Sequence, residues 1–477
     1  MFFLPAIQGR FPVGVTTFVS PVQRPRPIGT VKLRSPPTGS TRPNNALYLE
    51  EVAFTAYYPA DTTSKPITKG VDWFIRPVKE SLQGFSTFLG FSSWLLWPIV
   101  YFFGTLVKIP AYPNAPLLDP KNATVASENQ WPLVIFSHGL GGSRTAYSQF
   151  CSRLAASGRV VLAVEHRDGT GTVSMPRSWN IDGEKSKPRT LLYLRESDIH
   201  WDDDSDSIKT APFPLRVEQL AFRHHEVYIT YNTFHKFIHN TPGTHLETID
   251  GTHFDRKSWG LDEATEKPFV NCDENIVLAG HSFGGCTVLS ILSSNPSDEY
   301  DRLPVDKAII LDPWLEPLPA PGPFPMKSGG NNVKENNIAD FVSSALEQND
   351  IVPSATPAHP RMLVINSETF TLWKDHFARL QEIVKGWEPN GRRIVTLVGS
   401  KHTSFSDFPI LPIISGKTAR NIFNTIADVS VAFLDNRFEE QLKDAKIVKM
   451  EPKIIGVKKD GKPRRKLAGA PGDVIVE

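Results

Sequence analysis

Seven short apolar runs, each bounded by turn residues, alternate along the chain with segments of helical pattern. The runs lie near Val52, Leu133, Val160, Ile276, Ile309, Leu363 and Val395. Most are continuously apolar, which is typical of strands covered on both faces, as in a parallel sheet. Helical patterns occupy residues 144–156, 215–237, 287–292, 371–384 and 418–434. This alternation predicts an α/β fold with an open, doubly wound, mostly parallel sheet and helices on both faces.

The length of the chain allows one large core with loop insertions. With 477 residues, 40% of them hydrophobic, we expect a single domain over residues 1–442. A polar insertion at 168–210 and a Pro-, Gly- and Asn-rich insertion at 313–360 interrupt the strand–helix alternation. Residues 443–477 are basic and poor in aromatics, so we expect a flexible, solvated tail there, with nuclear targeting as the weaker alternative.

Charge and cysteine content exclude several classes of partner. The formal net charge is +1, so nothing points to nucleic acid, and no feature indicates a protein partner. Three scattered cysteines are too few for a disulfide framework or a zinc site and fit a reducing compartment. The first residues, MFFLPAIQGRFPVG, have no basic start and no long apolar stretch. We therefore expect no secretory signal and a cytoplasmic protein.

One strand-to-helix junction carries a recognisable chemical motif. In NIVLAGHSFGGCTVLSIL, residues 275–292, an apolar run ends abruptly at Gly280, Ser282 and Gly284, the pattern G-x-S-x-G. Glycines there allow a strained backbone and close packing of helix on strand, so that the serine hydroxyl stands clear of the sheet. A plain glycine turn is the alternative. The strand–turn–helix context favours a nucleophilic serine.

A serine hydroxyl becomes a useful nucleophile when a histidine takes its proton and a carboxylate orients that histidine. At such an elbow the chain order is serine, acid, histidine. The next strand after Ser282 ends in Asp312, and the last strand is followed by His402. Both positions belong to the carboxyl edge of the sheet, where reactive groups gather. We therefore predict a triad of Ser282, Asp312 and His402.

Other candidates for acid and base are weaker. His359 lies in a proline-rich loop and His376 inside a helical pattern, so both are expected to be structural. Asp407 is the competitor of Asp312 because it is close to His402, but it lies in a loop.

Two backbone amides are expected to bind the oxyanion. One is the N–H of Phe283, directly after the nucleophile, and the other is that of Leu140 in the glycine-rich loop of VIFSHGLGGSR. His138 precedes the serine and is expected to brace this loop. His224 and His225 are expected on a solvated helix face. We see no metal-ligand cluster and expect neither a metal nor a cofactor.

Six motifs, in this order, also carry a family resemblance: PLVIFSHGLGGSRTAYS, VVLAVEHRDGT, GHSFGG, ILDPW, LVINSE and GSKHTSFSDF. With EEVAFTAYYPAD they resemble the platelet-activating factor acetylhydrolases of the plasma and type II intracellular kind, from residue 50 to about residue 434. The resemblance implies a fungal-like serine esterase with the α/β-hydrolase fold. It also implies calcium-independent removal of the sn-2 acetyl or short oxidised acyl chain from phospholipids.

Residue by residue, the family's nucleophile, acid and base fall on Ser282, Asp312 and His402, and its oxyanion amides on Leu140 and Phe283. The chain departs from the family in its two insertions and its basic tail. A carboxylesterase or polyester hydrolase of the same fold is the main alternative, and a non-catalytic binding protein is the second. All three triad candidates are present, which argues against the latter.

The most apolar stretch, GFSTFLGFSSWLLWPIVYFFGTLVKIP, covers residues 84–110. Its uninterrupted part, 94–107, is shorter than the roughly 20 residues of a spanning helix and contains a proline and a glycine. A transmembrane helix, a buried core segment and an interfacial helix pair are the three interpretations. Aromatic residues suit a headgroup boundary, and the resembling enzymes have a lipid-binding segment there. We expect peripheral association with a phospholipid surface through Trp94, Leu95, Trp97 and Phe102.

Overall fold

The computed structural model describes most of the chain. The described residues are 1–35, 44–64, 66–91, 94, 97–98, 101, 104–123, 130–179, 185–201, 212–263, 265–326, 359–389, 391, 393–412, 414–457, 459 and 461–477.

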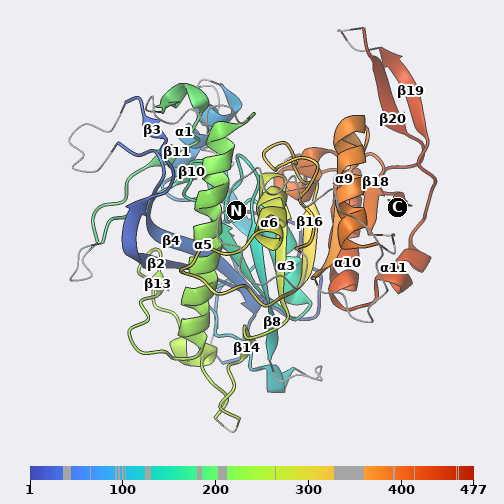
Figure 1. Cartoon of the computed structure of the whole chain (residues 1–477). Helices are drawn as coiled ribbons and strands as arrows, with labels where there is room; N and C mark the ends of the chain where they lie inside the picture. The colour runs from blue at the N-terminus through green and yellow to red at the C-terminus, as the bar shows by residue number, and fades with distance from the viewer. Residues whose placement is uncertain are drawn as a thin grey trace.

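A twelve-stranded sheet forms the centre of the protein (Figure 1). In spatial order its strands are β13 (Glu247–Thr248), β2 (Val13–Pro27), β4 (Tyr48–Pro59), β9 (Val160–Glu165), β8 (Trp131–Ser137), β15 (Ile276–His281), β16 (Val305–Leu311), β17 (Arg361–Ser367), β18 (Ile394–Leu397) and β21 (Val474–Val476), with β7 (Tyr112–Pro113) beside β2 and β14 (Val270–Asn271) beside β8. The run from β9 to β18 is parallel, whereas β2, β4 and β21 pair antiparallel. The seven predicted strands all occur, and the predicted α/β-hydrolase architecture is confirmed.

Helices cover both faces of this sheet. On one face lie α5 (Pro214–Ile238), α6 (Phe283–Ser293) and α9 (Lys374–Trp387), and on the other α3 (Ser148–Ala156), α10 (Lys417–Leu434) and α11 (Phe438–Asp444). Within β16, Ile310 packs into the core under α5, α6 and α9, whereas Ile309 and Leu311 pack into the core under α3, α10 and α11. The reason is that successive side chains of a strand point to opposite faces of the sheet. The continuously apolar strands therefore fill two cores at once.

Smaller elements complete the structure. Helices α1 (Val78–Leu89) and α8 (Glu368–Thr371) lie near the carboxyl edge of the strands. The others are β1 (Phe2–Phe3), β3 (Lys32–Leu33), β5 (Val71–Asp72), β6 (Val107–Ile109), β10 (Val173–Ser174), β11 (Leu191–Leu192), β12 (Ile199–His200), β19 (Pro452–Val457), β20 (Pro463–Leu467), η1 (Gly104–Leu106), η2 (Pro120–Asn122), η3 (Glu196–Asp198), η4 (Arg256–Trp259), η5 (His402–Phe405) and η6 (Phe408–Ile410).

The basic C-terminal segment is ordered, so the expectation of a flexible tail is wrong for its described residues. Strands β19 and β20 form an antiparallel hairpin that projects from the body of the molecule (Figure 1). Beyond it, β21 pairs with β18, and Val474 and Ile475 are buried. The basic residues of this segment lie mainly in the exposed hairpin. The apolar residues Val474–Val476 instead form β21, a strand of the central sheet.

The first predicted insertion, 168–210, is only partly a surface loop. Asp168 and Thr170 are fully buried, and β10 pairs with β11 while β12 pairs with β3. The polar side chains are inside because Arg223 of α5 binds both of them. Residues 180–184 and 202–210 of this insertion, and 327–358 of the second one, lie outside the described residues.

The apolar stretch 84–110 is not one helix. Helix α1 ends at Leu89, where Gly90 adopts the left-handed conformation with φ 72°, and the stretch later passes through η1 into β6. Gly90 tolerates this φ because it has no Cβ. Among the helices of the described residues, none combines the length and apolarity needed to cross a bilayer.

Candidate active site

The G-x-S-x-G turn has the strained geometry that its glycines predict. Ser282 has φ 57° and ψ −119°, which a side-chain-bearing residue adopts only when its surroundings hold it there. A Cβ on Gly280 would lie 2.3 Å from the carbonyl oxygen of Gly284, and one on Gly284 would lie 2.0 Å from that of Ser137. The two glycines are thus sterically required for α6 to begin against β8 and β15.

The structure brings together the three residues of the predicted triad. The hydroxyl of Ser282 donates to Nε2 of His402, with Oγ and Nε2 2.9 Å apart. The opposite ring nitrogen, Nδ1, donates to Oδ2 of Asp312 at 2.7 Å. The three residues follow β15, β16 and β18, whose carboxyl ends share one edge of the sheet. Ser282 and Asp312 are buried, whereas 35% of the His402 side chain is exposed.

Neighbouring groups hold this arrangement in place. Ser367, at the end of β17, donates to Asp312 through its backbone N–H (2.6 Å, to Oδ1) and its hydroxyl (2.8 Å, to Oδ2). The ring of Phe370 stacks on that of His402, with centroids 4.5 Å apart and planes at 11°. The carboxylate and the imidazole are therefore restrained from two sides.

Asp407, the competing acid, has a different position. Its carboxylate accepts hydrogen bonds from the N–H groups of Ser148 and Gln149, from the Ser148 hydroxyl and from the indole of Trp73. Burial raises the pKa of Asp407 to about 7, although these donors oppose the shift. Asp407 therefore binds the first amides of α3 rather than the ring of His402.

The glycine-rich loop after β8 runs directly beside Ser282. A Cβ on Gly139 would lie 2.8 Å from the Cβ of Ser282. The N–H of Gly141 donates to the carbonyl oxygen of Thr170 at 2.8 Å, which anchors the loop. Within the described residues, no acceptor pairs with the amide of Leu140 or of Phe283. The assignment of these two amides as oxyanion donors stays a prediction.

His281, the variable residue inside the motif, has a structural task that sequence reasoning missed. Its Nε2 donates to the backbone carbonyl oxygen of His402 at 3.0 Å, and its Nδ1 accepts from the hydroxyl of Tyr147 at 2.7 Å. Burial and the nearby His402 lower the pKa of His281 well below its ordinary value, so the ring is neutral. It links the turn to the loop that carries His402.

A buried polar network supports the glycine-rich loop from behind. Arg223 donates to the carbonyl oxygen of His138 (Nη1, 2.8 Å) and to Asp168 (Nε, 2.8 Å), and its guanidinium lies 4.5 Å over the Phe283 ring. His138 contacts its own loop, with Nδ1 2.9 Å from the carbonyl oxygen of Gly139. Sequence reasoning missed Arg223, because nothing in a helical pattern marks one arginine as buried.

The expected solvated helix face around His224 and His225 is only partly exposed, and Glu226, the next residue on this helix, is not exposed at all. Glu226 is fully buried, accepts from the backbone N–H of Arg167 and contacts Nδ1 of His166, both at 2.7 Å. His224 and His225 are half-buried and contact Ser290 and Tyr300. The helix carries a polar network on its buried side, which its sequence pattern does not distinguish from an exposed polar face.

The predicted lipid-contact segment lies next to this site. Phe88 of α1 covers the glycine-rich loop so closely that a Cβ on Gly141 would lie 2.3 Å from its ring. Just beyond α1, 72% of Trp94 and 41% of Trp97 are exposed, which contradicts a buried core segment at these two positions. Leu95 and Phe102 lie outside the described residues.

Two groups of metal-ligand type occur in the described part of the chain. One is His281, Asp312 and His402, and the other is His235, His239 and Asp273. The expectation of no metal-ligand cluster did not foresee the second group, because Asp273 comes to the histidines only through the packing of α5 against the loop after β14.

Several known proteins are similar to this chain. The family model for platelet-activating factor acetylhydrolase, isoform II, matches residues 3–321. The platelet-activating factor acetylhydrolase of Canis lupus familiaris is 28% identical, over 78% of this chain and 66% of that protein. Its Bos taurus counterpart is 30% identical, over 74% and 62%. The chain thus matches slightly less than two thirds of the length of these relatives. A ferulic acid esterase from Streptomyces cinnamoneus aligns with TM-score 0.45 and 16% identity, over 92% of this chain and 94% of the esterase.

Proposed function

Because the chain belongs to the family of platelet-activating factor acetylhydrolases, isoform II, we propose that it is a serine esterase acting on phospholipids. Its substrates are those with an sn-2 acetyl or short oxidised acyl ester. The observation that carries the proposal is the hydrogen-bonded series Asp312–His402–Ser282 beside two backbone amides that have no acceptor in the described part of the chain. Family membership supports ester hydrolysis, and the exposed apolar segment beside the site supports a lipid substrate.

The proposed reaction follows the two-step course of acyl transfer. The Ser282 oxygen attacks the ester carbonyl carbon while its proton passes to Nε2 of His402. The oxyanion accepts hydrogen bonds from the amides of Leu140 and Phe283. As the tetrahedral species collapses, the lysophospholipid oxygen takes the proton from His402 and leaves. Water, deprotonated by the same ring, then attacks the acyl-enzyme and releases the short carboxylic acid.

We also propose that the enzyme works at a lipid surface to which it binds peripherally. Trp94 and Trp97 are exposed just beyond α1, and Phe88 of that helix lies against the glycine-rich loop. Because lipid-facing aromatics and the catalytic edge are neighbours, a phospholipid has only a short path from the surface to Ser282. Leu95 and Phe102 are included among the proposed lipid contacts on the basis of the sequence alone.

Single substitutions test the assignment of the triad. Ser282→Ala and His402→Ala should each lower kcat on the order of 10⁴-fold, and Asp312→Asn by a comparable or somewhat smaller factor. Hydrolysis of a soluble aryl acetate measures the losses, and circular dichroism verifies the fold. Asp407→Asn is the matched control, because this carboxylate contacts α3 instead of His402. Severe loss in Asp407→Asn with normal activity in Asp312→Asn would reverse the assignment of the acid.

Graded substrates test the phospholipid class separately from the mechanism. Turnover of phosphatidylcholines with sn-2 chains of increasing length should be highest for acetyl and fall for long unoxidised chains. A general carboxylesterase or polyester hydrolase would instead cleave aryl esters well and short-chain phospholipids poorly. In that case the triad would stand and the substrate assignment would be wrong.

A further inference from the structure

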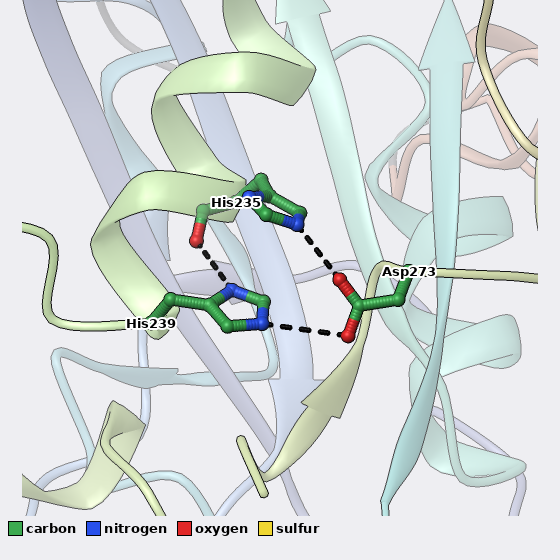
Figure 2. A group of neighbouring side chains, drawn as sticks. All are labelled: His235, His239 and Asp273. Atoms are coloured by element: carbon green, nitrogen blue, oxygen red, sulfur yellow. Dashed lines mark hydrogen bonds and ion pairs between the residues drawn. The ribbon is translucent and has the colours of Figure 1, made fainter.

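Three side chains with metal-binding chemistry meet at the edge of the sheet opposite the catalytic one. His235 and His239 lie at the C-terminal end of α5, and Asp273 follows β14 (Figure 2). Asp273 precedes β15, whereas Ser282 follows it, so the length of this strand separates the cluster from the triad. None of the three residues takes part in the proposed reaction.

The two rings face the same carboxylate. Residues four apart on a helix lie one above the other, and the two imidazole centroids are 4.2 Å apart with planes at 25°. Nε2 of His235 lies 2.7 Å from Oδ1 of Asp273, and Nε2 of His239 lies 3.4 Å from Oδ2. Each carboxylate oxygen therefore has one ring nitrogen opposite it, as Figure 2 shows.

The orientation of His239 is fixed in the way that metal ligands require. Its Nδ1 lies 2.9 Å from the backbone carbonyl oxygen of His235, which can only accept, so Nδ1 carries the hydrogen. Nε2 then presents its lone pair toward Oδ2 of Asp273. Two electron-rich atoms in this arrangement attract only when a cation, either a proton or a metal ion, lies between them. A backbone carbonyl behind the ring is the usual support of a metal-binding histidine.

The backbone around the cluster is also held in place. The N–H of Asp273 donates to the side-chain oxygen of Asn271 at 3.2 Å, and the hydroxyl of Tyr231 donates to the carbonyl oxygen of Cys272 at 2.9 Å. The hydrogen bond from Tyr231, which lies one helical turn before His235, joins α5 to this loop. The C-terminal end of a helix, with its unpaired carbonyl groups, is in addition a favourable place for positive charge.

We propose that His235, His239 and Asp273 bind one divalent transition-metal ion of the Zn²⁺ type, which clamps α5 to the β14–β15 connection. Two nitrogens and one carboxylate oxygen suit zinc, whose tetrahedral ligand atoms lie about 3.3 Å apart at the usual bond lengths. All three ligand atoms lie within 4.8 Å of one another, so small side-chain rotations suffice. Partial exposure of the side chains leaves the fourth position to water. On binding, the Nε2 proton of His235 moves to its Nδ1 or to solvent.

Calorimetric titration of the full, chelator-treated chain with ZnCl₂ tests the site. Wild type should bind one Zn²⁺ that Asp273→Asn and His239→Ala each weaken at least about tenfold. His253→Ala, which removes an exposed histidine outside the cluster, should bind like wild type. Aryl acetate hydrolysis should not change as this site fills, because the ion lies far from Ser282.

A second variant set separates the two histidine clusters. Binding that survives in Asp273→Asn but disappears in His402→Ala would place the ion at the triad and overturn the proposal. Absence of saturable binding to wild type would overturn it as well, and would leave a proton as the cation between His239 and Asp273. Thermal unfolding in chelator shows whether His239→Ala folds, and the isosteric Asp273→Asn keeps the test valid if it does not.

Discussion

Arg223 contacts both halves of the proposed oxyanion site, although it lies behind them on α5. It binds the carbonyl oxygen of His138, just before the glycine-rich loop, and its guanidinium covers the ring of Phe283. The buried carboxylate of Asp168 fixes the guanidinium in turn. In the proposed reaction the amides of Leu140 and Phe283 both donate to one oxygen atom, so an error in either backbone position weakens both hydrogen bonds. Arg223 is thus a positioning residue that touches no reacting atom.

Arg223→Lys should lower kcat by about 10- to 100-fold with little change in KM for a soluble aryl acetate. Lysine keeps the positive charge beside Asp168, so the fold is retained, but a single ammonium cannot reproduce the several directed contacts of a guanidinium. Steady-state kinetics and circular dichroism provide the measurement. Arg153→Lys is the matched control. This arginine is also buried, but it forms an ion pair with Asp428 of α10 instead of contacting the glycine-rich loop. Equal kcat in the two variants would show that Arg223 has no positioning role.

Among the helices, strands and turns, the sequence predicted those whose structure depends on local interactions. The parallel strands and the serine turn were foreseen because a buried strand must be apolar along its length and a strained turn needs glycine. The placement of Ser282, Asp312 and His402 followed from strand order alone. The buried side of α5 was not foreseen, because Glu226 and Arg223 are buried only through partners that are distant in sequence.

Strand β2 shows the same limit in another way. It contains Pro21, Pro25 and Pro27, which in a sequence argue against a strand. In the structure its pairing with β4 shifts register between Pro21 and Arg26, so an irregularity accommodates the prolines. Tertiary pairing here overrides the local signal.

The segment beyond α1 yields a prediction about lipid surfaces. Replacing Trp94 and Trp97 with Ser should weaken binding to phosphatidylcholine vesicles at least about tenfold, because each inserted apolar side chain contributes roughly 1.5–3 kcal/mol. Activity on aggregated phospholipid should fall with it, whereas aryl acetate hydrolysis should stay nearly constant. Ile454→Ser with Ile455→Ser, on the exposed hairpin, is the control pair. Loss of both activities together would indicate a structural rather than an interfacial segment.

For the whole molecule, buried histidines predict sensitivity to acid. Burial lowers the pKa of six histidines: the buried His138, His166, His281 and His376, and the half-buried His224 and His225. A histidine of the unfolded chain takes up a proton below about pH 6.5, whereas the folded protein resists protonation at these positions. At these positions the unfolded state therefore binds more protons as the pH falls, so the contribution of these histidines to stability decreases from about pH 7 downwards.

His376→Phe isolates one of these contributions. The pKa of His376 is lowered to about 4 by burial, against the opposing field of Asp312, and its ring stacks on Trp373 with centroids 4.7 Å apart. Phenylalanine keeps the stacking and removes the titration. Between pH 7.5 and 5, the free energy of unfolding of wild type should fall by about 2 kcal/mol more than that of the variant. Urea unfolding at both pH values measures this, and His253→Phe, at an exposed position, should follow wild type.

The pairing of β21 with β18 also has a consequence for biosynthesis. During translation, β18 emerges from the ribosome well before residues 474–476, which give it its outer neighbour. Until those residues appear, the nascent polypeptide presents an open β-edge whose N–H and C=O groups can pair with any other extended chain. The interval between the two strands is therefore a period in which a growing copy of this protein can co-aggregate through this edge, and in which a chaperone that shields strand edges has a target.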